Sequence, residues 1–300
     1  MKKNVERSAR CRRWNDQEEP VRKSPNYNLI AGCSLTAVTV SVIVLGFFWT
    51  PFDPDAMSPI KKSIGPCLSH FLGTDNFGRD ILSRVMEGAG TTLSIAFFAV
   101  SIGATFGTLI GGLTGYFGGV ADEIVMRIND AVTAFPSILL ALVVVSITGT
   151  GKEIIIIVLG ILFIPSFARV VRGEFAKQRN MDYVRNAKLM GVRHTRIMFV
   201  HILPNIGPVL LSSIAIGFNN AVLAEASMSF LGVGIKPSES ASLGRILLES
   251  QSYLFSAPWQ ALSAGCAISI LILGFALISE GLGYRRVWRT ATKRRRKVDA

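Results

Sequence analysis

Apolar residues along this chain gather into six stretches that polar segments separate. A helix of about 20 apolar residues crosses the roughly 30 Å hydrocarbon core of a bilayer. The pattern predicts membrane spans over residues 29–48, 91–113, 124–146, 154–171, 206–224 and 259–280. Pro165 marks a kink in the fourth span. The fold class expected is therefore all-α and integral to the membrane, with six transmembrane helices.

Composition and charge support this interpretation and set the orientation. Half of the 300 residues are hydrophobic and only 17% are charged, which favours a membrane protein over a soluble enzyme of this length. The net charge of +12 comes from basic clusters before Pro25, between Arg169 and Arg196, and after Gly283. Six spans place all three clusters on one side, and the positive-inside rule makes that side cytoplasmic. Nucleic acid is therefore not expected as a partner.

This pattern divides the chain into three parts. We expect a basic cytoplasmic N-terminal segment over residues 1–27, one six-helix membrane domain over 28–283, and a basic cytoplasmic tail over 284–300. Inside the membrane domain, residues 173–204 form a cytoplasmic loop long enough to carry its own structure.

A short helix is predicted within this loop. Asp182 can cap its N-terminus, and Gly191 can end it. Tyr183, Val184, Ala187 and Met190 share one face at helical spacing, so the helix has one apolar side. An ordinary basic loop without any partner is the alternative reading of this segment.

The spacing in this loop resembles the EAA loop of ABC-importer membrane subunits. The small-residue pair is Asn186-Ala187, the glycine is Gly191, and Leu203-Pro204 follows about a dozen residues later. Arg185 and Asn186 stand where Glu and Ala are most usual in that family. The resemblance implies that the loop helix docks into an ATPase subunit, with these coupling residues: Tyr183, Arg185, Asn186, Ala187, Gly191, Arg196, Leu203 and Pro204.

A second segment resembles the C-type permease subunits of dipeptide, oligopeptide and nickel importers. It covers residues 70–97 and contains Leu72-Gly73-Thr74-Asp75 and Gly78-Arg79-Asp80. From the residues alone, Asp75 can cap a short helix and Arg79 can pair with Asp80. We interpret the motif as a structural anchor of the outer loop. Matches at residues 115–119, 122–136 and 224–237 follow in the family's order.

The resemblance implies a type I ABC-importer permease in the bacterial cytoplasmic membrane. Its expected partners are membrane lipid, a second related permease subunit, two cytoplasmic ATP-binding subunits and an extracytoplasmic solute-binding protein. Peptides are the favoured substrate class, and nickel or a metal chelate is the alternative. The chain departs from the family pattern at Ser242-Leu243-Gly244 and at 279–282, and these departures weaken any substrate assignment.

A stand-alone ion-coupled carrier or channel is the rival reading, and it needs ionisable residues within the spans. The third span holds Arg127 and Asp130 at i, i+3, where they can form an intramembrane pair. Glu225 and Glu280 lie near span ends and are expected at the membrane interface. The spans contain few other charges, so the importer remains favoured.

No catalytic constellation, cofactor or metal site is expected. Gly149-Thr150-Gly151-Lys152 lacks the remaining positions of a phosphate-binding loop and is read as a turn. Cys67 and His70 offer only two metal ligands on the outer side. The chain is thus not predicted to be an enzyme, and any ATP hydrolysis is assigned to separate subunits.

Overall fold

The computed structural model describes residues 27–236 and 240–298, with side chains as far as residue 282. The predicted basic segment 1–27, apart from Tyr27, and the side chains of the tail 284–300 lie outside this description. The described helices are α2 (Tyr27–Phe48), α3 (Ile81–Phe117), α4 (Gly119–Thr133), α5 (Ser137–Thr148), α6 (Lys152–Arg179), α7 (Asp182–Leu189), α8 (His194–Arg196), a π-helical turn (Ile197–Ile202), α9 (Leu203–Phe230), α10 (Leu243–Ser250) and α11 (Pro258–Val298), with 3₁₀ turns at Pro59–Lys61 and Gln251–Tyr253.

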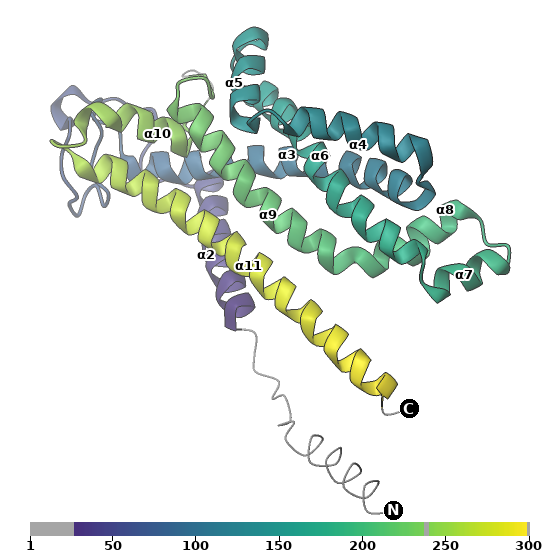
Figure 1. Ribbon diagram of the computed structural model, residues 1–300. Coiled ribbons are helices and arrows are strands. Elements are labelled where there is room, and N and C mark those ends of the chain that lie inside the picture. The colour runs from purple at the N-terminus through teal and green to yellow at the C-terminus, as the bar shows by residue number, and fades with distance from the viewer. Residues whose placement is uncertain (1–26, 237–239, 299–300) are drawn as a thin grey trace, which may run out of the picture.

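The long helices form one bundle whose two ends differ (Figure 1). Helices α3, α6 and α9 lie side by side, and α2 packs with α11 on their flank. Helix α10 and the loop before α3 occupy one end, whereas α7 and α8 occupy the other. The two sequence motifs, residues 70–97 and 183–205, therefore begin from opposite ends of the molecule.

Five of the six predicted membrane spans are single helices, and the sixth, the predicted third span, is a bent pair of helices. Five helical segments are long and apolar enough to cross a membrane: α2, α3, α6, the continuous stretch His194–Phe230, and α11 as far as Leu282. Helices α4 and α5 meet the same criteria only as a pair, bent by 81°. Pro136 separates them, because it has no N–H to donate and disfavours helical geometry in the residue before it. Pro165, in contrast, stays inside α6.

A seam of glycines joins α3 to α6. Gly103, Gly107, Gly111 and Gly115 recur every four residues and so lie along one side of α3. A Cβ on Gly107 would stand 2.5 Å from the Cβ of Phe167, and one on Gly103 would stand 2.6 Å from the Cβ of Phe163. Only glycine permits this approach, and small residues spaced by four are a recurrent means of packing helices in lipid.

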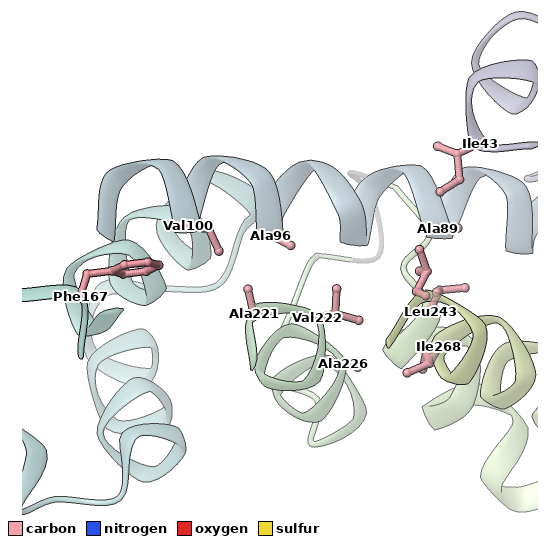
Figure 2. Close-up of a cluster of buried hydrophobic side chains, with 11 residues drawn as sticks. Ile43, Ala89, Ala96, Val100, Phe167, Ala221, Val222, Ala226, Leu243 and Ile268 are labelled. Carbon is pink, nitrogen blue, oxygen red and sulfur yellow. The ribbon is translucent and has the colours of Figure 1, made fainter. Parts of the chain in front are cut away.

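The central core is built around α3 and α9 (Figure 2). Small alanines on both helices let them approach each other, and larger side chains from α2, α6, α10 and α11 close the edges. The buried members are Ile43, Ala89, Ala96, Val100, Phe167, Ala221, Val222, Ala226, Leu243, Ile268 and Leu271. One cluster thus ties five helices to α3.

At the α10 end, a buried network of charges fixes the loop before α3. The Asp75 carboxylate accepts from Arg79 Nε at 2.7 Å and from Arg84 Nη1 at 2.8 Å. Glu249 on α10 accepts from both arginines at 2.7 Å. Burial alone would raise the pKa of the Glu249 carboxyl, but the neighbouring arginines, Arg84 first, outweigh it and hold this pKa below its ordinary value of 4.5. The network clamps α10 against the start of α3.

Two details of the motif differ from the sequence prediction. Asp75 does not cap a helix; it accepts the backbone N–H groups of Phe77 and Arg79 within a turn. Asp80 does not pair with Arg79; it caps α3 by accepting from Ser83 N at 2.9 Å, and its other oxygen contacts His70 Nδ1. Arg79 and Asp80 are neighbours in the chain whose side chains point in different directions, so Arg79 pairs with Asp75 and Glu249 while Asp80 caps α3.

Glu225, expected at the membrane interface, is fully buried inside the protein, where α9 faces α3. Its carboxyl accepts from Thr92 Oγ1 at 2.8 Å and from Ser229 Oγ at 2.7 Å. The backbone N–H of Leu243, at the start of α10, donates to the same threonine oxygen at 3.4 Å. Hydroxyl partners on two helices thus satisfy a polar group that hydropathy alone places at a span end. Glu280 is exposed.

The glycine seam yields a first prediction. Gly107→Ala should lower the stability of the purified protein by about 1–3 kcal/mol, because the new methyl overlaps Phe167 where both backbones are fixed. Thermal unfolding in detergent, followed by intrinsic fluorescence, measures the effect. Gly173→Ala on α6 is the matched control, since a Cβ there meets nothing within 4 Å. Equal unfolding temperatures for the two variants would contradict the seam.

The charge network yields a second prediction. Glu249→Gln should cost about 3 kcal/mol at neutral pH, because Arg79 and Arg84 are buried and lose an anion. Glu249 has a lowered pKa in the folded state, so its contribution is complete above the ordinary value of 4.5 and is lost as the pH falls through the lowered value. The difference in free energy of unfolding between wild type and Glu249→Gln should therefore disappear at acid pH.

Urea or thermal unfolding at several pH values measures this gap. Glu123→Gln is the control, because Glu123 pairs with Arg127 on an exposed surface. Such a pair contributes at most about 1 kcal/mol. A pH-independent gap for Glu249→Gln would show that the carboxylate charge is not what stabilises the loop.

Candidate functional site

The loop helix predicted from the sequence is α7, and its end is built as expected. Met190 N–H donates to Asn186, Gly191 N–H to Lys188 and Val192 N–H to Ala187, which together form a Schellman motif. Gly191 has φ +73°, a left-handed conformation that other residues adopt only at a cost. At the other end Met181, not Asp182, occupies the cap position. Asp182 is the first helical residue, where its charge suits the helix dipole.

Helix α7 packs through two small residues. Val184 and Ala187 are buried against the ends of α3 and α6 and against the π turn, in a cluster with Tyr116, Val171, Phe175, Ile197, Met198, Ile202 and Ile206. Tyr183 and Met190, predicted on the same apolar face, are 37% and 76% exposed. The outward side of α7 therefore presents Leu189 and Met190 beside the exposed Arg185 and Asn186.

Tyr116, at the end of α3, connects this region to the bundle. Its hydroxyl lies 2.7 Å from His194 Nδ1, and the ammonium of Lys188 lies 5.0 Å from its ring centre. Arg179 Nη1 donates to its carbonyl at 3.3 Å. In the sequence analysis, Tyr116 was included only in the family match at residues 115–119, and His194 was given no role. The contact joins residues 78 positions apart, so local spacing could not reveal it.

A second polar cluster fixes the start of α7 to the start of α9. Tyr183 Oη donates to Gln178 Oε1 at 3.0 Å, and Asn205 Nδ2 donates to the same oxygen at 3.2 Å. Asn205 also approaches the tyrosine oxygen at 3.3 Å. Of these three, only Tyr183 was predicted as a site residue. Gln178 and Asn205 were missed.

The loop continues into the fifth span without a break. Arg196 is exposed at the end of α8, and the π turn carries the chain directly into α9. Leu203 N–H donates to Met198, five residues earlier, as in a π-helix. Pro204 follows at the start of α9 and cannot donate a hydrogen bond of its own. The predicted Leu203-Pro204 pair thus lies where the wide turn becomes an ordinary helix.

A cavity of about 690 Å³ opens between α5, α6 and α9 and the end of α4. Its walls are largely aliphatic and aromatic, and they include Leu162, Phe163, Ile216 and Leu223. Hydroxyl and amide groups interrupt them at Thr133, Ser137, Ser166, Ser213 and Asn220, and Arg169 is the charged residue of this lining. Its size lies within the range of small-ligand sites.

The predicted pair of Arg127 and Asp130 does not form. Arg127 Nη2 donates to Glu123 Oε1 at 2.6 Å, one turn earlier on α4. Asp130 accepts from Arg169 Nη2 of α6 at 2.8 Å. The spacing i, i+4 with the acid first is the favourable order on a helix, and α6 supplies Asp130 with a partner that the sequence pattern could not show.

The two remaining segments considered in the sequence are the Cys67–His70 pair and the turn at residues 149–152. His70 lies between Asp80, at 2.9 Å from Nδ1, and the ammonium of Lys61, at 3.5 Å from Nε2. Within the described part of the chain, no three His, Cys, Asp or Glu residues are arranged to hold a metal ion. Residues 149–151 form the short connection between α5 and α6.

Known proteins share both the sequence and the fold. The family described as binding-protein-dependent transport system inner membrane component matches residues 107–282. The dipeptide transport system permease protein DppC of Alkalihalophilus pseudofirmus is 34% identical over 270 residues, which cover 90% of this chain and 88% of that protein. The glutathione transport system permease protein GsiD of Pectobacterium atrosepticum is 38% identical over 248 residues, which cover 81% and 82%.

Among solved structures, an inward-facing form of the MetNI methionine ABC transporter superposes with a TM-score of 0.53 and 20% identity, over 65% of this chain and 94% of that chain. This likeness supports the type I importer fold predicted from the motifs. The chain therefore belongs to the binding-protein-dependent transport system inner membrane components, and it is a membrane-spanning permease subunit of an ABC importer.

Proposed function

We propose that this permease imports dipeptides or oligopeptides. The observation that carries this proposal is the similarity along most of the chain to permeases named for dipeptide, glutathione and peptide transport. The cavity supports it, because mixed walls with scattered hydroxyl and amide groups suit peptides of varied side chains. The aliphatic walls would contact the side chains of the peptide, and the hydroxyl and amide groups would form hydrogen bonds with its backbone.

The proposed complex contains a second related permease, two ATP-binding subunits and an extracytoplasmic solute-binding protein. The three basic clusters support a cytoplasmic location for α7 and for both chain termini. The α10 end then faces outward, towards the binding protein. ATP hydrolysis takes place in the separate subunits, so this chain supplies the path and not the chemistry.

In this arrangement α7 is the docking helix for an ATPase subunit. Leu189 and Met190 offer exposed apolar side chains, and Arg185 and Arg196 offer charge beside them. Ala187 and Gly191 hold the helix in place, whereas Tyr183, Asn186, Leu203 and Pro204 frame its two connections to the bundle. Because α7 packs on α3 and α6 and is joined through the turn at residues 190–193 to the continuous helix that contains α9, its displacement moves the helices around the cavity. In the proposed mechanism this movement opens the cavity to one side of the membrane and then to the other, which is alternating access.

Coupling gives a third prediction. Gly191→Val should leave membrane insertion intact, since a Cβ there meets nothing within 4 Å. It should nevertheless reduce peptide uptake about tenfold or more per ATP hydrolysed, because φ +73° strains a β-branched residue by about 1–2 kcal/mol and displaces the end of α7. Uptake and hydrolysis in proteoliposomes holding the whole transporter measure the ratio.

Gly207→Val is the matched control for this variant. Its Cβ also meets nothing within 4 Å, and its φ is not positive. Coupled uptake should survive in the control. Normal coupling in Gly191→Val would show that the end of α7 does not transmit the motion.

A fourth prediction concerns the complex itself. Purification of this chain in mild detergent from its native host should recover a second six-span subunit and an ATP-binding subunit, identified by mass spectrometry. Purified together and reconstituted, they should require ATP for uptake. Recovery of the chain alone, with solute movement that ignores ATP, would replace the importer with a carrier or channel.

A further inference from the structure

Two ion pairs join α4 to α6, and they are built differently. Arg172 donates hydrogen bonds to the Asp122 carboxylate from two nitrogens, Nε at 3.0 Å and Nη2 at 2.6 Å. The Asp122 side chain is only 12% exposed. Arg169 contacts Asp130 through one bond of 2.8 Å, and the two side chains are 53% and 68% exposed. The first pair is a bidentate, half-buried clamp. The second is a single contact open to its surroundings.

The arginine of the open pair lies at the cavity. Arg169 belongs to the cavity wall, and Thr133, which also accepts a hydrogen bond from Arg169 at 3.0 Å, lines it as well. Exposed Ser166 stands one turn earlier on α6, and exposed Asn220 contributes from α9. In contrast, Arg172 is absent from this lining, as are both aspartates, Asp122 and Asp130. Arg169 and Arg172 carry the same charge, but only Arg169 lines the cavity.

Arg169 has capacity for another anion. Both of its hydrogen bonds come from Nη2, whereas a guanidinium carries five N–H donors in a fork that fits a carboxylate. A single exposed ion pair contributes little to stability, about 0–1 kcal/mol. A charged group among membrane helices is costly unless it is paired or solvated. The Asp130 contact therefore neutralises Arg169 without holding it firmly.

We propose that Arg169 binds the C-terminal carboxylate of the transported peptide, which replaces Asp130 on the guanidinium. This inference rests on the proposed peptide substrate. The exchange of one carboxylate for another keeps the charge of the cavity balanced, so no unpaired guanidinium is left within the membrane domain at any stage. Asp130, once displaced, is available to the ammonium group of the same peptide. Recognition of a terminus and not of a side chain leaves the sequence of the peptide free to vary.

The test uses the whole transporter in nanodiscs without its binding protein, so that only the permease meets the probe. Ser166→Cys is introduced beside Arg169, and labelling at position 166 by a small maleimide is followed by mass spectrometry. Millimolar alanyl-alanine should slow this labelling several-fold, whereas its C-terminal amide should not. Arg169→Gln should abolish the protection, and Arg172→Gln, the matched control, should retain it.

Uptake separates this inference from the proposed function. Wild-type transporter with its binding protein should import alanyl-alanine, and Arg169→Gln should lower that uptake about tenfold, the loss of one charge-assisted hydrogen bond. Absence of uptake of alanyl-alanine and of trialanine by wild type would overturn the peptide assignment. Wild-type uptake without carboxylate-dependent protection, or equal protection by the amide, would overturn the role of Arg169 alone.

Discussion

The close approach of α3 and α6 is the constraint on which the rest of the structure depends. The glycines along α3 bring the two backbones so near that side chains of α6 fill the space where Cβ atoms would stand. In lipid, where apolar surface gains little by leaving its surroundings, such van der Waals contact is the main source of helix association. The pair then offers one surface to α9, one to the broken third span, and one end to α7.

In the proposed docking role of α7, the rigid seam between α3 and α6 is the part of the bundle against which this helix packs. Val184 and Ala187 of α7 pack on the ends of both helices, and the Tyr116–His194 contact adds a polar link to the same place. A force applied to α7 therefore reaches packed backbone and not a loose loop. At the opposite end, Arg79 just before α3 and Arg84 in its first turn hold α10, so both ends of the bundle are anchored to the same long helix.

Much of this fold could be predicted from the sequence, because hydrophobic spans, proline and glycine act locally. Gly191 ends α7 as predicted. In the outer motif, Asp75 accepts hydrogen bonds from backbone N–H groups two and four residues later, which closes a local turn. Two differences from the sequence prediction involve partners that lie far along the chain. Asp130 was assigned to Arg127 on its own helix but is bound by Arg169, 39 residues away. The burial of Glu225 was missed because hydropathy does not show its contact with Thr92, 133 residues away. The 81° bend at Pro136 was also missed, since a proline in a span can leave a helix intact, as Pro165 does.

The continuous helix from His194 to Phe230 has a mechanical consequence. Its 37 residues make a rod of roughly 55 Å, which reaches from the docking region to the opposite end of the bundle. The π turn at Ile197–Ile202 lies near one end of this rod, where the hydrogen bonds are more widely spaced and Pro204 follows. If the rod tilts about this turn, the 28 residues beyond it form an arm of about 42 Å, and a tilt of about 5° shifts its far end by about 4 Å. Under the proposed coupling, a small movement at a nucleotide-binding partner would then change the width of the passage for solute.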